Sequence, residues 1–197
     1  MITEPPPSDL NARIAEQVRL LRRQRGLSLE DLAARSGVSR SMISVIERGE
    51  SSATAVVLER LATGLGVALA SLFDRPDAPA SPLARRDEQP TWRDPQSGYL
   101  RRNVSPPGFT APLRIVEVLF PPLARVAYET AEREVPVHQQ VWVLEGRLQV
   151  GTGGQQHELG PGDCLAMTLD APTLFHNPGP QTTRYAVVLN VASEPRR

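Results

Sequence analysis

Residues 29–49 read LEDLAARSGVSRSMISVIERG, and this stretch decides how the N-terminal part of the chain folds. Gly37 can adopt a positive φ without steric cost, which predicts a sharp turn between two short helices. Ser39 follows the turn and is a favourable N-cap for the second helix. Ile43 and Ile46 lie three residues apart on that helix, so they share its buried face. The stretch therefore predicts two helices that cross at a tight turn.

The outer face of the second helix carries side chains that donate hydrogen bonds. The spacing puts four of them there: Arg40, Ser41, Ser44 and Arg48. Donors on the outer side of an amphipathic helix are what reading base edges in the DNA major groove requires. Residues 13–48 also contain eight arginines against four acidic residues, although the whole chain has no net charge. This local positive excess suits one half of a dimeric DNA-binding protein.

The run from Ser36 to Ser39, Ile43 and the run from Ile46 to Gly49 resemble the most distinctive part of the lambda-repressor-like (XRE) helix-turn-helix family. The resemblance covers roughly residues 11–73 and implies a five-helix bundle that binds double-stranded DNA. It implies base or phosphate contacts by Ser28, Ser39, Arg40, Ser41, Ser44, Val45 and Arg48. It also implies that Arg22 and Glu47 form a partly buried ion pair between the first and third helices.

Capping residues mark where the other helices begin: Asp9 or Asn11 for the first, Ser28 for the second and Thr54 for the fourth. Asp31 occupies the capping-box position after Ser28. An apolar run that ends at Phe73 predicts a fifth short helix. The prolines of residues 74–90 then predict a semi-rigid linker. We therefore divide the chain into a helix-turn-helix domain at 9–73, this linker, and a β domain at 91–193.

Beyond the linker, the apolar pattern changes to a period of two. The predicted strands are 99–104, 114–120, 124–128, 137–144, 147–151, 155–159, 164–167, 173–177 and 184–191. Short strands separated by Gly-Gly and Pro-Gly turns predict a sandwich or barrel. Residues 91–121 are expected to extend the sheet and to contribute to dimer contacts. The chain is thus an α + β two-domain protein.

Three runs in this part resemble the two sequence motifs of the cupin family, a small double-stranded β-helix. They are Val141–Leu148, Leu159–Asp163 and Ala171–Pro178, and the resemblance covers roughly residues 121–191. An XRE-type helix-turn-helix joined to a cupin is the layout of a known class of transcriptional regulators. In that class the cupin usually forms a homodimer and senses a small molecule.

The metal ligands of the cupin family are replaced in this sequence. By the resemblance, the usual Glu falls at Gln139, the usual His pair near Arg133 and Val135, and the His of the second motif at Thr173. Glutamine and threonine are weak ligands for divalent iron, zinc or manganese. The chain has three histidines, and His138 or His176 would bind a metal only if the alignment slipped. We therefore expect no metal and no cofactor.

Without a metal, the barrel interior is expected to be a largely apolar pocket that takes a small organic effector, such as an acid or an aromatic compound. Strand parity and the family alignment put seven side chains in it: Tyr128, Gln139, Val141, Val143, Met167, Thr173 and Phe175. A cupin that only dimerises and binds nothing is the alternative. The single cysteine, Cys164, has no basic neighbour in sequence and is expected to be a buried structural thiol.

These patterns predict a dimeric, sequence-specific DNA-binding transcriptional regulator and not an enzyme. No apolar run is long enough to span a membrane and no signal peptide is evident, so we expect a cytoplasmic protein. One alternative is a mononuclear-metal cupin enzyme that carries a helix-turn-helix domain, which would need the His and carboxylate ligands. Another is an antitoxin-like repressor with a protein partner, although such chains rarely carry a cupin.

Overall fold

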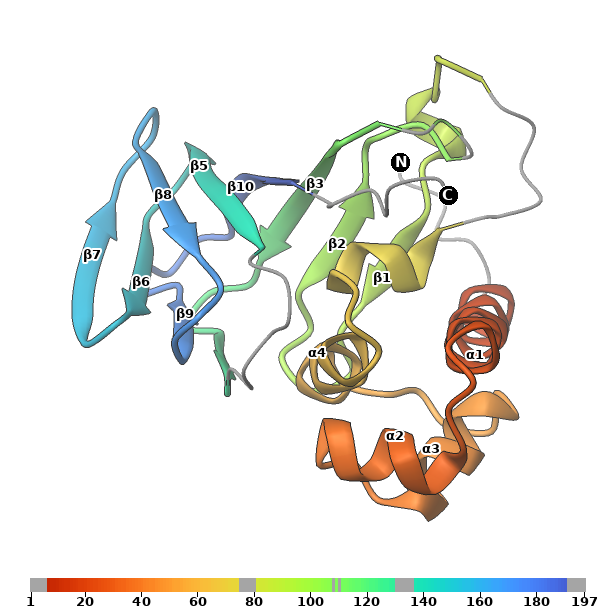
Figure 1. Ribbon diagram of the computed structural model, residues 1–197. Helices are drawn as coiled ribbons and strands as arrows, with labels where there is room; N and C mark the ends of the chain where they lie inside the picture. The colour runs from red at the N-terminus through yellow and green to blue at the C-terminus, as the bar shows by residue number, and fades with distance from the viewer. Residues whose placement is uncertain (1–6, 75–80, 108, 110, 130–136, 191–197) are drawn as a thin grey trace.

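The computed structural model describes residues 7–74, 81–107, 109, 111–129 and 137–190. Four α-helices come first in this part of the chain: α1 (Pro7–Gln24), α2 (Leu29–Ser36), α3 (Arg40–Glu47) and α4 (Ala55–Gly64). A short 3-10 helix, η1 (Leu69–Phe73), follows them, and another, η2 (Arg86–Glu88), precedes the strands. The helices gather at one end of the molecule and a β-sandwich occupies the other (Figure 1).

The local signals that predict the first helices are confirmed. The Ser28 side chain accepts from the Asp31 N–H, and the Asp31 carboxylate accepts from the Ser28 N–H, which completes the capping box. Ser39 caps α3 and Thr54 caps α4 in the same way. Gly37 has a φ of 65°, the left-handed conformation that the turn between α2 and α3 requires.

Two predictions about the helices need correction. The first helix begins at Pro7 rather than at Asp9 or Asn11, which agrees with the preference for proline in the first turn of a helix. The fifth helix of the predicted bundle is η1, a 3-10 helix of five residues. An α-helix of that length would form very few of its i to i+4 hydrogen bonds, so the tighter helix is favoured.

Ten strands form two antiparallel sheets in the part of the chain that the structure describes. They are β1 (Thr91–Arg93), β2 (Leu100–Asn103), β3 (Leu113–Phe120), β4 (Arg125–Tyr128), β5 (His138–Glu145), β6 (Leu148–Thr152), β7 (Gln155–Leu159), β8 (Cys164–Thr168), β9 (Thr173–His176) and β10 (Thr183–Asn190). The larger sheet has the order β1-β2-β3-β10-β5-β8, and the smaller has the order β4-β9-β6-β7. This is the cupin fold that the motifs predicted.

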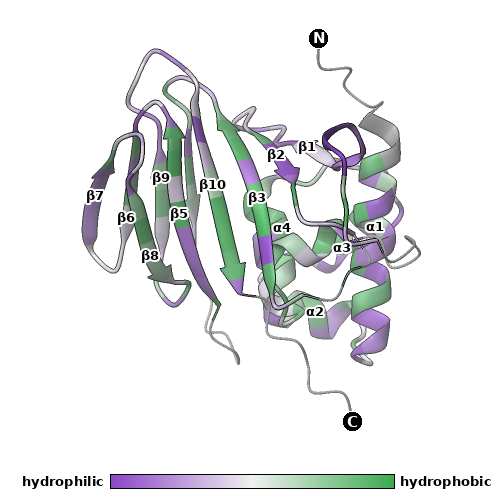
Figure 2. Ribbon diagram, turned by 90° about the horizontal axis from the view of Figure 1, so that it is seen from above, coloured by the Kyte–Doolittle hydropathy of each residue, from purple (hydrophilic) through white to green (hydrophobic). Residues whose placement is uncertain are grey.

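Side-chain alternation builds the interior of the sandwich. On β5, Gln139, Val141 and Val143 are buried, whereas His138 and Trp142 are exposed. Apolar residues run along β3, β10 and β5, the central strands of the larger sheet (Figure 2). The period of two in the sequence therefore separates inner from outer side chains, as predicted.

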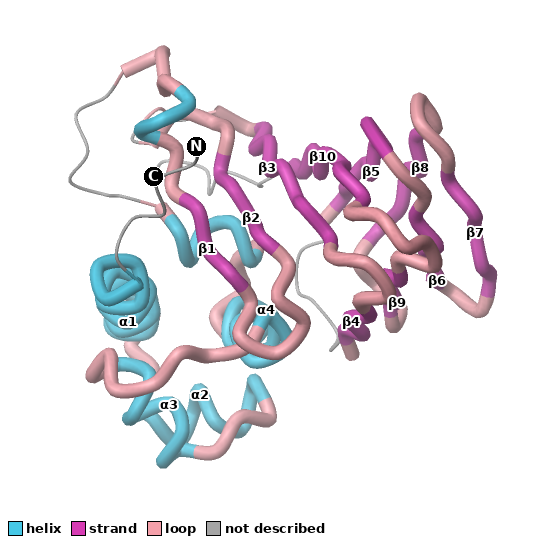
Figure 3. The backbone as a smooth tube through the Cα atoms, turned by 180° about the vertical axis from the view of Figure 1, so that it is seen from behind, coloured by secondary structure: helices cyan, strands magenta, loops and turns pink. Residues whose placement is uncertain are grey.

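The β1–β2 hairpin lies between the helices and the rest of the β-sandwich (Figures 1 and 3). The Trp92 ring on β1 meets the Phe73 ring of η1 edge-on, with their centroids 5.8 Å apart. The buried carboxylate of Asp94, just after β1, accepts from the Ala55 N–H at 2.9 Å, at the start of α4. As a result, one continuous cluster of buried residues extends from the helices into the sandwich.

The predicted linker at 74–90 falls partly outside the described residues, and the domain boundaries remain a prediction. Residues 75–80 are not described. The short strand β1 was not predicted individually, although residues 91–121 were expected to extend the sheet. Val191, the end of the last predicted strand, also lies outside the described part.

We expect Asp94→Ala to destabilise the whole chain, because the Ala55 N–H would lose its acceptor. The free energy of unfolding should fall by about 2 kcal/mol, since an unsatisfied buried donor costs about 1–3 kcal/mol. Urea denaturation followed by circular dichroism measures the change. Asp163→Ala is the matched control, because the Asp163 carboxylate accepts from the Gly160 N–H in an exposed turn. An equal loss in both variants would contradict the role assigned to Asp94.

Candidate nucleic-acid interface and barrel cavity

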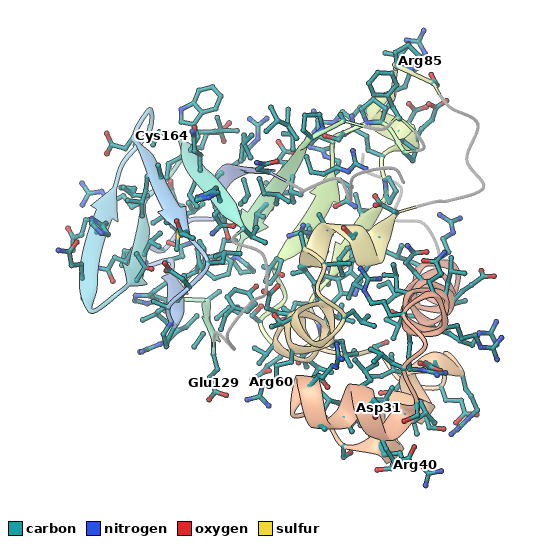
Figure 4. All side chains as sticks on the ribbon, viewed as in Figure 1. Asp31, Arg40, Arg60, Arg85, Glu129 and Cys164 are labelled. Atoms are coloured by element: carbon teal, nitrogen blue, oxygen red, sulfur yellow. The ribbon has the colours of Figure 1, made fainter. Side chains whose placement is uncertain are left out.

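Helix α3 presents the predicted donor-bearing face to solvent. Ser39, Arg40, Ser41 and Arg48 are exposed, Ser44 and Val45 are half-buried, and Ser28 is exposed at the start of α2. On the opposite side, Ile43 and Ile46 are buried in the core. Arg40 points away from the β-sandwich at the far end of the helical part (Figure 4). Met42, which the sequence analysis did not consider, is also exposed on α3.

Both arginines of this face already have carboxylate partners. Arg40 Nε lies 2.7 Å from Glu30 Oε1, with both side chains about two-thirds exposed. Arg48 makes two 2.7 Å bonds to the Glu50 carboxylate and donates to Ser44 Oγ at 2.5 Å. The guanidinium of Arg48 lowers the pKa of Glu50 through these hydrogen bonds. Because exposed ion pairs are weak, both arginines can exchange these partners for an anion.

The predicted ion pair between Arg22 and Glu47 is confirmed, and it ties α3 to α1. Arg22 Nε and Nη2 donate to the two Glu47 oxygens at 2.6 and 2.8 Å. Arg22 Nη1 also donates to the Leu27 carbonyl at 2.9 Å. Hydrogen bonding to Glu47 raises the pKa of Arg22 above its ordinary value. Both side chains are largely buried, so the pair fixes α3 against the bundle.

A cavity of about 80 Å³ lies where the β-sandwich meets α4 and η1. Its wall includes Glu59 on α4, Leu69 on η1, Arg101 on β2 and Tyr185 on β10. Both halves of the molecule therefore contribute side chains to it. Arg60 on α4 and Glu129 after β4 form an ion pair beside it, where they point toward each other (Figure 4).

Three buried tyrosines give the cavity polar atoms that stay protonated. The hydroxyls of Tyr99 and Tyr128 lie 3.3 Å apart. Burial raises the pKa of Tyr99 to about 12 and the pKa of Tyr128 well above its ordinary value. Burial also raises the pKa of Tyr185. All three rings carry neutral hydroxyl groups at physiological pH, and each of these can donate a hydrogen bond.

The structure brings four of the seven predicted pocket residues into the cavity wall: Tyr128, Gln139, Thr173 and Phe175. Val141 and Val143 are fully buried and Met167 nearly so, but they lie outside that wall. The two valines follow Gln139 along β5, deeper in the sandwich, where side chains fill the interior. Met167 Sδ lies behind the wall, 3.4 Å from Gln139 Nε2.

The sequence analysis missed the only arginine in the described cavity wall. Arg101 is 7% exposed, and its guanidinium carbon lies 5.3 Å from the centre of the Phe73 ring. Strand parity could have indicated it, because Tyr99 and Arg101 are two residues apart and share a face of the sheet. The contribution of Glu59 had no comparable signal, because it depends on how the helices pack against the sandwich.

Comparison with known proteins agrees with this arrangement. Residues 18–72 match the HTH_3 helix-turn-helix family. The uncharacterized HTH-type transcriptional regulator y4dJ of Sinorhizobium fredii is 36% identical over 69 residues, which cover 35% of this chain and 90% of that protein. The chain belongs to the XRE-type helix-turn-helix family.

Two further similarities extend across both parts of this family member. The HTH-type transcriptional regulator SutR of Escherichia coli is 28% identical over 185 residues, covering 87% of this chain and 91% of SutR. The crystal structure of an HTH_3 family transcriptional regulator from Vibrio cholerae has a TM-score of 0.75 at 26% identity. It covers 97% of this chain and 100% of the other. The combination of helices and β-sandwich is therefore shared with other transcriptional regulators.

The histidines lie apart from one another. His138 is exposed and bonds Thr168 Oγ1 through Nδ1 at 3.2 Å, while His176 bonds Gln149 Oε1 at 2.9 Å. Among the described residues, no three His, Cys, Asp or Glu side chains lie close enough to share a metal ion. Arg133 and Val135, two of the replaced ligand positions, lie outside the described part. No described helix is long and apolar enough to cross a membrane.

The prediction that Cys164 is buried is wrong. Its side chain is exposed on β8, an edge strand of the larger sheet (Figure 4). Cys164 pairs with Trp142 across the strands, and both side chains point to the outer face. Strand parity relative to Trp142 decides the exposure, whereas the general preference of free cysteine for burial does not.

We expect Glu47→Ala to cost the chain about 3 kcal/mol of unfolding free energy, because a largely buried guanidinium would lose its partner. Glu50→Ala is the matched control, since it removes an equally charged partner from the exposed Arg48 and should leave stability unchanged. Urea denaturation of both full-length variants measures the difference. Similar stabilities for the two variants would show that the Arg22–Glu47 pair does not fix α3.

Proposed function

We infer that this protein is a cytoplasmic transcriptional regulator that binds specific DNA sequences as a homodimer through α3, and that its cupin binds a small organic molecule. The exposed, donor-bearing face of α3 carries the proposal, because the rest of that helix is held rigidly by buried isoleucines and by the Arg22–Glu47 pair. The names of the similar proteins, which are transcriptional regulators, support it.

In this proposal α3 enters the major groove with its N-terminal turn leading. Arg40 pairs bidentately with a guanine, Ser41 and Ser44 bond base edges, and Val45 contacts a thymine methyl group. Arg48 and the helix start at Ser28 contact phosphates. Arg40 and Arg48 release Glu30 and Glu50 when DNA binds. DNA affinity should therefore fall as the salt concentration rises.

Selection from a random DNA library with the full-length protein tests the proposal, because no operator needs to be known beforehand. The sequence that is enriched should bind Arg40→Ala roughly 5- to 150-fold more weakly, corresponding to about 1–3 kcal/mol for one bidentate base contact. Fluorescence anisotropy measures the affinity. Arg147→Ala is the matched control, because it removes the same charge from an exposed site on the cupin. If no sequence is enriched, the DNA-binding proposal fails.

The homodimer is proposed because a helix-turn-helix regulator reads two half-sites about one helical turn, roughly 34 Å, apart. The outer face of the larger sheet supports a contact with a second copy there. Leu113, Ile115 and Trp142 are 53, 42 and 48% exposed on it. The register aligns Ile115 with Val188, and Trp142 with Ala186, so these apolar side chains share one face. A second copy that packs on this face would remove it from water.

We expect Trp142→Arg to convert the dimer into a monomer, because a charged side chain would be buried at the centre of the proposed contact. Size-exclusion chromatography with light scattering measures the mass. Leu123→Arg is the control, since Leu123 is 69% exposed on the turn between β3 and β4, away from this face. A Trp142→Arg variant that stays dimeric would exclude this face.

A further inference from the structure

We propose that the cavity between the β-sandwich and the helices binds a small carboxylate, that Arg101 holds the carboxylate group, and that its occupancy fixes the helical part against the barrel. The inference rests on the proposed function, because it names the class of small molecule that the regulator senses. It places this ligand at the junction of the two parts of the chain, and not in the deeper barrel interior.

The argument begins with the unmet hydrogen bonds of Arg101. Its side chain is 7% exposed, yet Nε and Nη2 are buried without a hydrogen-bond partner. The Phe73 ring, 5.3 Å away, favours a cation but accepts no hydrogen bond of ordinary strength. A buried charge without a partner is costly. A carboxylate matches the guanidinium geometry and would neutralise that charge.

The other walls fit the remaining atoms of such a ligand. The neutral hydroxyls of Tyr99 and Tyr128 can donate to a carboxylate oxygen beside Arg101. Val118, Phe175 and Leu189 supply an apolar wall for a short carbon chain. The cavity volume of about 80 Å³ is well below the roughly 300 Å³ or more of drug-sized pockets. The ligand should therefore contain only a few carbon atoms.

The carboxylates in the wall do not favour a cationic ligand instead. Glu129 is paired with Arg60, and Glu59 already has a partner of its own. An amine placed in the cavity would meet the uncompensated guanidinium of Arg101 and be repelled. The unmet charge is positive, so the complementary ligand is an anion.

The position of Arg101 connects the ligand to the helices. Arg101 lies over Phe73, the last residue of η1, and Leu69 and Ala70 of the same helix line the cavity. Glu59 lines it from α4, which the Arg60–Glu129 pair ties to the strand side. A ligand that bridges β2 and β4 would hold α4 in one position relative to the barrel. Since the spacing of the two α3 helices depends on that position, DNA affinity should change.

Isothermal titration calorimetry of the full-length protein tests the site. The probes are acetate, propionate and pyruvate at constant ionic strength, with acetamide and propionamide as uncharged controls of similar shape. We expect at least one carboxylate to bind at least tenfold more tightly than its amide. Arg101→Met should weaken that binding at least tenfold, and Tyr128→Phe should weaken it several-fold. Equal binding of acids and amides, or no binding by any of the three acids, would overturn the proposal.

The readouts separate this inference from the proposed function. If Arg101→Met does not fold, as circular dichroism would show, Tyr128→Phe and the acid–amide comparison decide. Anisotropy with the selected DNA, with and without the carboxylate, measures coupling, and an affinity that does not change would overturn the proposed link to the helices. If the acids bind but no DNA is enriched, the regulator function fails and the cavity assignment survives. The reverse result removes only the ligand.

Discussion

The docking of the β1–β2 hairpin against the helices is the contact on which the rest of the structure depends. Trp92 meets Phe73 on the helical side and Tyr99 on the strand side, with both pairs of ring centroids 5.8 Å apart. The ring contacts continue through Phe120 and Tyr185 to Phe175, and Phe175 meets Tyr128. Aromatic pairs of this kind add to the free energy gained by burial. The helices and the barrel therefore fold around one core.

The proposed DNA-binding face gains its rigidity from this arrangement. Helices α2 and α3 have eight residues each, which is too short for stability in isolation. They depend on tertiary packing, on the Arg22–Glu47 pair and on α4, whose first turn is capped in part by Asp94 from the hairpin. The surface that would read DNA and the cavity that would take a ligand thus share structural supports.

Local sequence signals predicted what depends on a few neighbouring residues. Gly37, Ser28 and Ser39 specify the turn and the caps by their own conformational and hydrogen-bonding preferences, and alternation in β5 separates Gln139 from His138. The Asp94–Ala55 contact joins residues 39 apart, and the unmet hydrogen bonds of Arg101 arise only after packing. Strand β1, with three residues, is too short to carry a period. These features follow from tertiary structure, so the sequence pattern alone does not reveal them.

The shared core also constrains how such a chain can evolve. Gene fusion that joined this helical part to a different barrel, cut at the proline-rich segment, would separate Phe73 from Trp92 and leave α4 without its acceptor. The product would expose an aromatic ring and begin life with a frayed helix. Successful exchange must therefore carry the hairpin along with the helices. The evolutionary module of this protein ends after β2, well beyond the segment where the polypeptide looks divisible.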